Sequence, residues 1–166
     1  MSKIFEYILE RNQDQKEQNC TCQLSNSFSQ PIHLVAYNGN LHILKILLEN
    51  GAQIVAKNRF GDTPLHIAIR NKQRQFAKWV IQYLTKNRYS RALVEIENAT
   101  EKLTPYMLAV LREDFEIANM LVQSKLAKPD FVNIEGLTVL QIAINLNRTR
   151  VINYLGGKTP GDRKLH

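Results

Sequence analysis

The sequence predicts an all-α fold: a solenoid of about four helix-turn-helix units with short β-turn fingers and an N-terminal capping helix. One observation is a helix-starting segment that occurs four times, with marker residues at positions 31, 64, 105 and 139 and intervals of 33, 41 and 34 residues. A second is that each copy is followed by a turn and by apolar residues three or four apart. Because such a unit cannot bury its apolar face alone, neighbouring units are expected to stack.

The best-preserved copy of the segment reads GDTPLHIA and covers positions 61–68. Thr63 suits the N-cap of a helix because its hydroxyl can accept a backbone N–H, and Pro64 has the φ required at the first helical position. Gly61 is expected to complete a tight turn with φ above zero. The other three copies begin at Gln30-Pro31, Thr104-Pro105 and Thr138-Val139.

The second helix of each unit is predicted from an apolar stripe of helical spacing. In the first unit, the turn is expected at 37–40, and Gly51 is expected to end the second helix in a left-handed conformation. Trp79 lies within the second stripe and is expected in the core. The four stripes are Ile43, Leu44, Leu47 and Leu48; Phe76, Ala77, Trp79, Val80, Ile81 and Leu84; Phe115, Ile117, Ala118, Met120, Leu121 and Val122; and Val151, Ile152, Tyr154 and Leu155.

These elements divide the chain into a capping helix with a polar loop, a repeat region and a flexible tail, at 1–30, 31–157 and 158–166. The longer second interval indicates an insertion of about eight residues, which lengthens the second helix of the second unit and the loop that follows it. The four repeats are expected at about 29–60, 61–101, 102–135 and 136–157.

The formal net charge is +7, and its basic part is concentrated in one stretch. No acidic residue occurs between Thr63 and Val94, where the basic residues are Arg70, Lys72, Arg74, Lys78, Lys86, Arg88 and Arg91. A basic patch favours an acidic partner, which could be nucleic acid, an anionic membrane or an acidic protein surface. A solvated face that aids solubility is the simpler alternative, and no nucleic-acid-binding motif accompanies the cluster.

No sequence motif indicates catalysis, a cofactor or a metal site. The sequence lacks a phosphate loop, a zinc-protease motif and four-cysteine spacing. Cys20 and Cys22 are expected to be free thiols of a reducing compartment. The N-terminus lacks the apolar run of a signal peptide, and no segment is long and apolar enough for a membrane span. We therefore expect a non-enzymatic, monomeric protein of the cytoplasm, with access to the nucleus.

At positions 50–54, 58–61 and 63–68 the chain resembles ankyrin-repeat proteins, whose signatures include NGADVN, DxxG and TPLHxA. The resemblance runs from about Ser29 to Leu155. It implies a finger leading into an antiparallel helix pair in each unit and a concave face along the stack. It also implies that His33 and His66 bridge backbone groups of neighbouring units. The fourth unit has Val139 and Gln141 in place of Pro and His, so it is expected to be less rigid.

The extended second unit followed by a standard one resembles the opening repeats of IκB inhibitors, including the virus-encoded type. This resemblance implies binding to Rel/NF-κB transcription factors and inhibition of their DNA binding, in a host cell if the chain is viral. No phosphodegron of the Asp-Ser-Gly-x-x-Ser type occurs, which implies an inhibitor that signalling does not degrade. The basic cluster opposes this, because Rel factors present basic surfaces and like charges reduce affinity. The alternative is an ankyrin adaptor or host-directed effector with a different, acidic protein partner.

The residues expected to contact a partner lie at the finger tips and on the outward positions of the first helices. Phe60 and Tyr37 are the best anchor candidates, because aromatic residues and arginine contribute a large share of interface energy. The predicted contact residues are Tyr37, Lys57, Asn58, Arg59, Phe60, Asp62, Arg70, Asn71, Lys72, Arg74, Lys102, Leu111 and Arg112, with Thr100, Glu101 and Leu103 beside them on the second finger.

Overall fold

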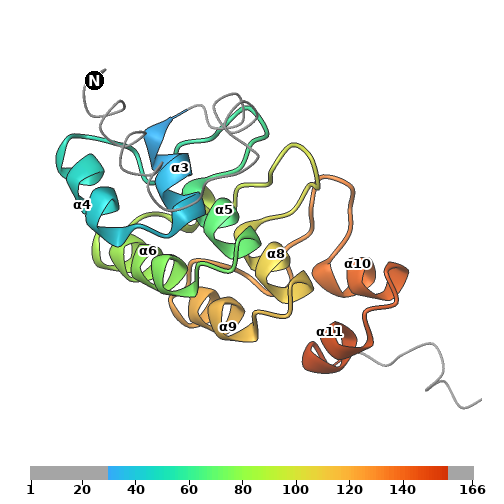
Figure 1. Cartoon of the computed structure of the whole chain (residues 1–166). Coiled ribbons are helices and arrows are strands. Elements are labelled where there is room, and N and C mark those ends of the chain that lie inside the picture. The colour runs from blue at the N-terminus through green and yellow to red at the C-terminus, as the bar shows by residue number, and fades with distance from the viewer. Residues whose placement is uncertain (1–29, 157–166) are drawn as a thin grey trace, which may run out of the picture.

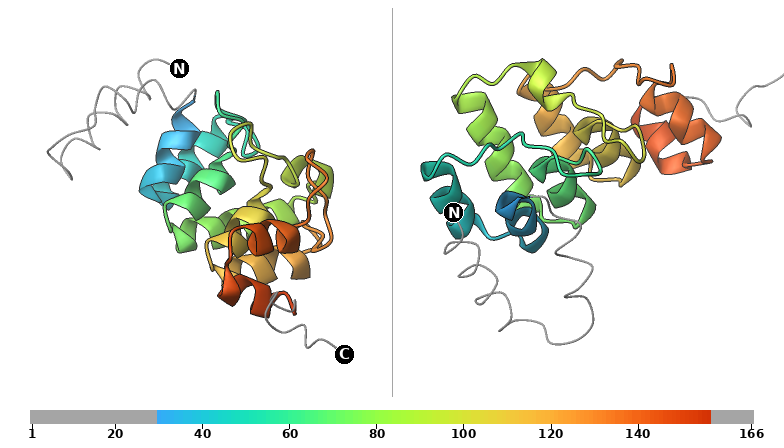
Figure 2. Two further views of the ribbon diagram at one scale, coloured as in Figure 1. Left: turned by 90° about the vertical axis from the view of Figure 1, so that its right-hand side faces the viewer. Right: turned by 90° about the horizontal axis from the view of Figure 1, so that it is seen from above.

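The computed structural model describes residues 30–156, which form two layers of antiparallel helices stacked side by side (Figure 1). The predicted capping helix and polar loop, Cys20, Cys22 and the predicted tail lie outside these residues. The first described helix and the last lie at opposite ends of the stack, and the loops between successive helix pairs lie on one side of it (Figures 1 and 2). Repeated stacking of one helix pair is the predicted all-α solenoid.

The inner layer contains the first helix of each pair, and the outer layer contains the second. The inner helices are α3 (Pro31–Asn38), α5 (Pro64–Arg70), α8 (Pro105–Leu111) and α10 (Val139–Asn145). The outer helices are α4 (Leu41–Glu49), α6 (Arg74–Lys86), α9 (Phe115–Gln123) and α11 (Thr149–Tyr154). A short helix, α7 (Arg91–Val94), lies between α6 and α8. Residues 30–156 contain no β-strand, only an isolated antiparallel bridge between Val132 and Thr138.

Each inner helix begins where the repeated segment predicts. The N-cap residues Thr63, Thr104 and Thr138 have extended backbones, and the hydroxyls of Thr104 and Thr138 each accept the backbone N–H three residues on, at 3.3 Å. Gln30 has the same extended backbone but caps nothing with its side chain. The first inner helix therefore lacks a hydrogen bond that two other inner helices make.

A left-handed residue ends each inner helix and turns the chain into the outer one. These residues are Gly39, Lys72, Glu113 and Asn147, with φ from 52° to 72°. In each case the next residue donates its backbone N–H to a carbonyl five positions back, at 2.8–3.1 Å. This closure satisfies carbonyls that the helix end would leave unpaired. The turn predicted at 37–40 is shorter than expected, because α3 continues through Asn38 and Gly39 is its C-cap.

The core lies between the layers and runs through all four helix pairs. The apolar positions of α5 and α8 are almost wholly buried, whereas Leu140, Ile142 and Ile144 of α10 are only half-buried. α10 contacts α8, and no further inner helix is described beyond it. The fourth unit is therefore the least enclosed part of this core.

The insertion of the second unit is divided between two elements. At 13 residues, α6 is longer than α4 and α9, which have 9 each, so the prediction of a lengthened helix is confirmed. The prediction that Lys86, Arg88 and Arg91 lie in the inserted loop is wrong in part, because Lys86 is the last residue of α6 and Arg91 begins α7. The buried side chain of Val94 anchors α7 to the core. The insertion is thus packed onto the stack.

We predict that Gln30→Thr stabilises the protein by about 1 kcal/mol, because it supplies the missing N-cap hydroxyl to α3. The measurement is the urea unfolding midpoint at constant slope. Gln82→Thr makes the same change at an exposed position inside α6, where threonine is a poorer helix former than glutamine. It should lower the free energy of unfolding by about 0.5 kcal/mol. Equal shifts of both midpoints would contradict the capping explanation.

Candidate protein-interaction surface

The loops between helix pairs form three fingers, and an asparagine shapes each one. Fingers 1, 2 and 3 are residues 57–62, 97–103 and 132–137. The side-chain Oδ1 atoms of Asn58, Asn98 and Asn133 each accept two backbone N–H groups of their own finger, at 2.9–3.3 Å. All three asparagines are buried. The fingers are therefore held from within by short-range hydrogen bonds.

A left-handed residue completes each finger: Gly61, Lys102 and Gly136, with φ of 74°, 56° and 76°. A side chain at Gly61 is excluded for a second reason, because a Cβ atom there would lie 2.7 Å from the backbone N of Ala99. That N–H donates to Phe60 O at 2.8 Å, so fingers 1 and 2 are joined backbone to backbone. Gly61 permits this close contact.

Buried histidines connect each of the first two inner helices to the chain at the following finger: His33 reaches the residue directly before finger 1, and His66 reaches finger 2. His33 Nε2 lies 3.0 Å from Ala56 O, and His66 Nε2 lies 3.1 Å from Leu103 O. His66 Nδ1 accepts the backbone N–H of Thr63 at 3.2 Å. Burial is the main cause that lowers the pKa of both, for His66 to about 4, so the bridges use neutral imidazoles. The predicted bridging role of both histidines is confirmed.

Arg70 joins fingers 1 and 2 through a network of charged and amide groups. Its guanidinium donates to the two carboxylate oxygens of Asp62 at 2.6 and 3.3 Å and to Glu101 at 2.6 Å. Asn98 Nδ2 donates to the same two carboxylates, at 3.0 and 3.1 Å. Asp62 is buried, so its charge depends on these partners.

The outer surface of finger 1 presents an aromatic ring and several basic groups. Phe60 is 36% exposed, and the guanidinium of Arg59 lies 4.6 Å from its ring centroid. Lys57 is also exposed. Tyr37, at the end of α3, is 38% exposed, and its carbonyl accepts from Gln73 Nε2 at 2.9 Å. These side chains are the exposed aromatic and cationic groups of finger 1 and the end of α3 among the predicted contacts.

Much of the basic stretch is matched by acidic residues of the following repeat. Arg74 pairs with Asp114 and Lys78 with Glu116, both from α6 to the start of α9, in addition to the pairs of Arg70. The Lys78 hydrogen bond is the main cause that lowers the pKa of Glu116. The cluster is therefore largely an internal connection between repeats.

The remaining basic residues of the stretch lie mostly at helix ends. Arg91 pairs with Glu95 within α7 and its C-cap, at 3.1 Å. Lys72 and Arg88 occupy left-handed positions one residue beyond the C-caps of α5 and α6. A cation at a helix C-terminus interacts favourably with the helix dipole. Their charge therefore has a local structural explanation.

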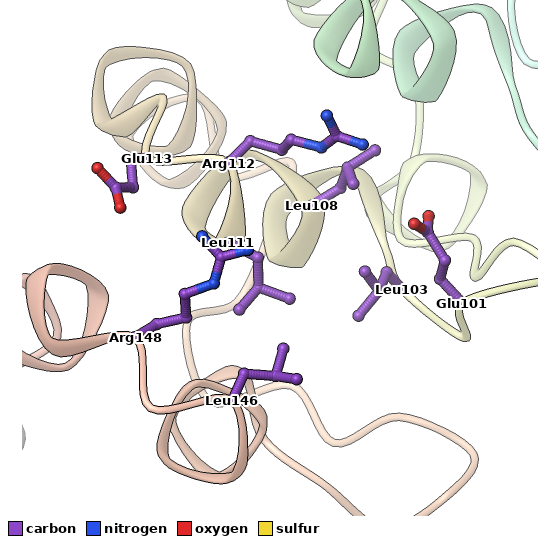
Figure 3. Close-up of a pocket in the computed structure, with 8 residues that line it drawn as sticks. All are labelled: Glu101, Leu103, Leu108, Leu111, Arg112, Glu113, Leu146 and Arg148. Carbon is purple, nitrogen blue, oxygen red and sulfur yellow. The ribbon is translucent and has the colours of Figure 1, made fainter.

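A groove of about 400 Å³ lies between α8 and α10, beside finger 2. Figure 3 shows the side chains of Leu111 and Leu146 pointing toward one another across it, while Glu113 points away. Leu111 is nearly buried, whereas Leu146 is 56% exposed and forms an open wall. The groove is lined by Glu101, Leu103, Leu108, Leu111, Arg112, Glu113, Leu146 and Arg148.

A family model of ankyrin repeats, in three copies, matches residues 1–92. This covers more than half of the chain, and the helix pairs, fingers and bridging histidines agree with it. This chain belongs to the ankyrin-repeat family. Ankyrin repeats are non-enzymatic modules that bind other proteins, so the fingers and the inner helices carry the candidate functional surface.

Relatives of the ankyrin domain include proteins named as NF-κB inhibitors. The chain is 35% identical over 103 residues to I-Kappa-B like protein I1 of Microplitis demolitor bracovirus, covering 60% of this chain and 58% of that one. It is 34% identical over 92 residues to the NF-kappa-B inhibitor cactus of Drosophila melanogaster, 54% of this chain and 17% of cactus. An ankyrin repeat protein of Rickettsia bellii is 59% identical over 39 residues, 24% and 16% of the two chains. The chain spans less than two thirds of each of these relatives.

The ankyrin stack separates the exposed predicted contact residues into two groups, one at finger 1 and the end of α3 and one at the groove. Leu111 and Arg112 lie together at the groove, with Glu101 and Leu103 of finger 2. Asn58 and Asp62 are corrections to the predicted surface, because both are buried and hold finger 1 together. Other predicted residues with internal hydrogen bonds or left-handed backbones are Arg70, Asn71, Lys72, Arg74 and Lys102.

Sequence reasoning missed four residues of the groove: Leu108, Glu113, Leu146 and Arg148. Leu146 carried a usable signal, because it occupies the turn position that Asn71 and Arg112 fill in the preceding repeats. An apolar residue at an otherwise polar turn indicates an exposed contact. Leu108 gave no such signal, because it continues the ordinary apolar pattern of an inner helix.

Trp79 differs from its predicted place in the core. It is half-buried on the outer layer, where its ring stacks on Tyr83 with centroids 5.2 Å apart, and Lys45 Nζ lies 6.0 Å from the ring. Helical spacing could not separate the centre of the buried stripe from its edge. A second hollow, of about 280 Å³, lies beside this tryptophan and is lined by Lys45, Leu48, Glu49, Trp79 and Tyr83.

The described part of the chain offers no metal site and no membrane span. Within residues 30–156, no group of three or more His, Cys, Asp or Glu side chains could hold a metal ion. No helix in the same range is long and apolar enough to cross a bilayer.

We predict that Arg70→Ala destabilises the protein by about 3 kcal/mol, because it leaves the buried carboxylate of Asp62 without its cation. Glu101→Gln should cost only about 1 kcal/mol, since Glu101 is more exposed. Urea unfolding measures both changes. Lys86→Ala, at the exposed end of α6, is the control and should change stability by less than about 0.5 kcal/mol. Equal effects of Arg70→Ala and Lys86→Ala would contradict the proposed network.

We predict that His66 makes stability fall as the solution is acidified. Above its ordinary pKa of 6.5, the imidazole is neutral in both the folded and the unfolded chain, so its contribution is fully present. Between pH 6.5 and about 4, only the unfolded chain takes up the proton readily. The free energy of unfolding therefore falls by about 3 kcal/mol across this range. Urea unfolding across this range is the measurement. His66→Gln, which copies Gln141, should remove this part of the pH dependence, and parallel curves would contradict the prediction.

Proposed function

We propose that this chain is an IκB-like protein that binds Rel/NF-κB transcription factors and prevents them from binding DNA. The observation that carries the proposal is the similarity to a bracovirus I-Kappa-B like protein, at 35% identity over three fifths of this chain. Cactus, an NF-kappa-B inhibitor, supports the same assignment at 34% identity. With no phosphodegron motif in the sequence, binding would persist when signalling degrades other inhibitors.

The lengthened second repeat is consistent with this proposal, and the charge pattern opposes it less than the sequence indicates. Arg74 and Lys78 pair with acids of the next repeat, and Arg70 pairs with acids of fingers 1 and 2, so their charges are largely compensated inside the stack. A basic Rel surface would then meet a less repulsive face than the seven basic residues between Thr63 and Val94 imply. The protein would act in the cytoplasm, with access to the nucleus, as a monomer.

Finger 1 and the end of α3 supply the contact residues that we favour for the Rel factor. Phe60 and Tyr37 are exposed aromatic side chains, and Phe60 lies beneath the guanidinium of Arg59. Residues of this kind are enriched among the few that dominate interface energies. The polar residues beneath them hold the finger in place, so the aromatic side chains are presented on a fixed support.

An adaptor or effector function with an acidic partner is the second candidate. The groove between α8 and α10 favours it, because Arg112 and Arg148 stand at the edge of an apolar floor. The two candidates use different parts of the inner face, and they can be tested separately.

We predict that the purified chain retains a Rel homology domain in a pull-down and competes with DNA for it. Phe60→Ala combined with Tyr37→Ala should weaken binding by about tenfold or more, since both side chains are exposed and their loss leaves the core intact. His42→Ala, on the exposed outer side of α4, is the matched control and should bind normally. Absence of binding at micromolar concentrations would refute the Rel assignment.

A further inference from the structure

We infer that the groove between α8 and α10 binds an acidic peptide segment that inserts one leucine-sized apolar side chain. This inference goes beyond the Rel proposal and does not rest on it, because it concerns the chemistry of the groove itself. Its evidence is an apolar floor, an exposed apolar wall and a rim whose acidic charges are already paired.

The groove has the shape and the lining needed for a single apolar anchor. Its floor consists of Leu103, Leu108 and Leu111, which come from finger 2 and α8, and Leu146 at the end of α10 closes the opposite side. Its volume of about 400 Å³ falls within the range of sites that hold small ligands. Leu146 is 56% exposed, so an occupant would remove its apolar surface from water.

The rim of the groove and its ion-pair partners together carry a small positive charge. Glu113 is paired with Arg150 at 2.7 Å, and Glu101 is paired with Arg70 at 2.6 Å, although Arg70 is shared with Asp62. The four arginines Arg70, Arg112, Arg148 and Arg150 stand against the three acids Asp62, Glu101 and Glu113, which leaves a net charge of +1. Among residues 30–156, no carboxylate forms an ion pair with Arg112 or Arg148. Two lining arginines therefore remain to meet carboxylates of an occupant.

The positive rim favours an acidic peptide over the two other possible occupants, which are residues 157–166 of this chain and a second copy of the chain. Residues 157–166 of the chain follow α11 and carry Lys158, Arg163 and Lys164 against one acid, Asp162, so their charge matches the rim poorly. A second copy of the chain has the same net charge of +7, which disfavours self-association. An acidic segment with a central leucine satisfies both the floor and the rim.

The test is fluorescence anisotropy of the full-length chain with a labelled synthetic peptide of aspartate and glutamate residues around one leucine. We expect saturable binding that weakens as salt is raised, because the rim contacts are exposed charges. Replacing the peptide leucine by alanine should weaken binding by about tenfold, and replacing its acids by lysines should abolish it. A peptide that binds equally well without its leucine or its acids would overturn the inference, as would no binding.

Three protein variants localise the binding. Leu146→Ala should weaken it about tenfold, and combined Arg112→Glu and Arg148→Glu should weaken it further and reduce its salt dependence. Combined Lys86→Glu and Arg88→Glu gives the same charge change at the exposed end of α6 and should bind normally. Circular dichroism confirms that each variant is folded. Equal losses in the two charge-reversed variants would overturn the assignment to this groove.

Two further measurements distinguish peptide binding at the groove from self-association of the chain and from Rel binding. Sedimentation of the chain alone detects self-association, and a dimer that Leu146→Ala dissociates would overturn the peptide assignment. The Leu146→Ala variant is also tested in the Rel pull-down. Rel binding without peptide binding would refute the groove assignment alone, whereas peptide binding without Rel binding would refute the proposed function alone.

Discussion

The buried polar junction beneath fingers 1 and 2 is the interaction on which the rest of the binding face depends. His66 connects the start of α5 to Leu103 of finger 2, and Arg70 connects the end of the same helix to Asp62 and Glu101. One short helix thereby contacts finger 2 from its start and both fingers from its end. Because His66 and Asp62 are buried and Arg70 is half-buried, leaving one of these three groups unpaired would be costly, and this cost favours a single arrangement of the fingers.

The repeat and its helices could be predicted from the sequence because local signals agree with the global pattern. Thr-Pro at Thr63-Pro64 starts a helix, and apolar spacing defines its face. The hydrogen bond from the Thr63 N–H to His66 in the same cap was found only in the structure. Finger residues were harder to predict. Asn58 belongs to a polar run that indicates an exposed turn, yet its side chain points inward and accepts two backbone N–H groups. Single-sequence patterns identify a turn, but not the direction of a polar side chain within it.

The basic stretch shows a second limit of sequence reasoning. Counted along the chain, residues 63–94 contain only positive charge, whereas in space Arg74 and Lys78 face Asp114 and Glu116 of the next repeat. Arg74 and Asp114 are 40 residues apart in the sequence, about the length of the extended second repeat, and stacking brings them together. In a solenoid, charge is therefore best assessed between equivalent positions of successive repeats, and a net charge over one segment overstates the field that a partner meets.

The groove lies where the polar connections between repeats change. The first two junctions each contain a buried imidazole, from His33 and His66. The third repeat has Met107 at this position. Finger 3 is connected to finger 2 by a hydrogen bond in which Asn133 Nδ2 donates to Lys102 O at 3.1 Å. A methionine cannot donate to the next finger, so the contact between α8 and α10 relies on apolar packing. In α10, three apolar residues remain half-buried and Leu146 faces the hollow. The junction that lacks a bridging imidazole thus coincides with the apolar surface that a partner could cover.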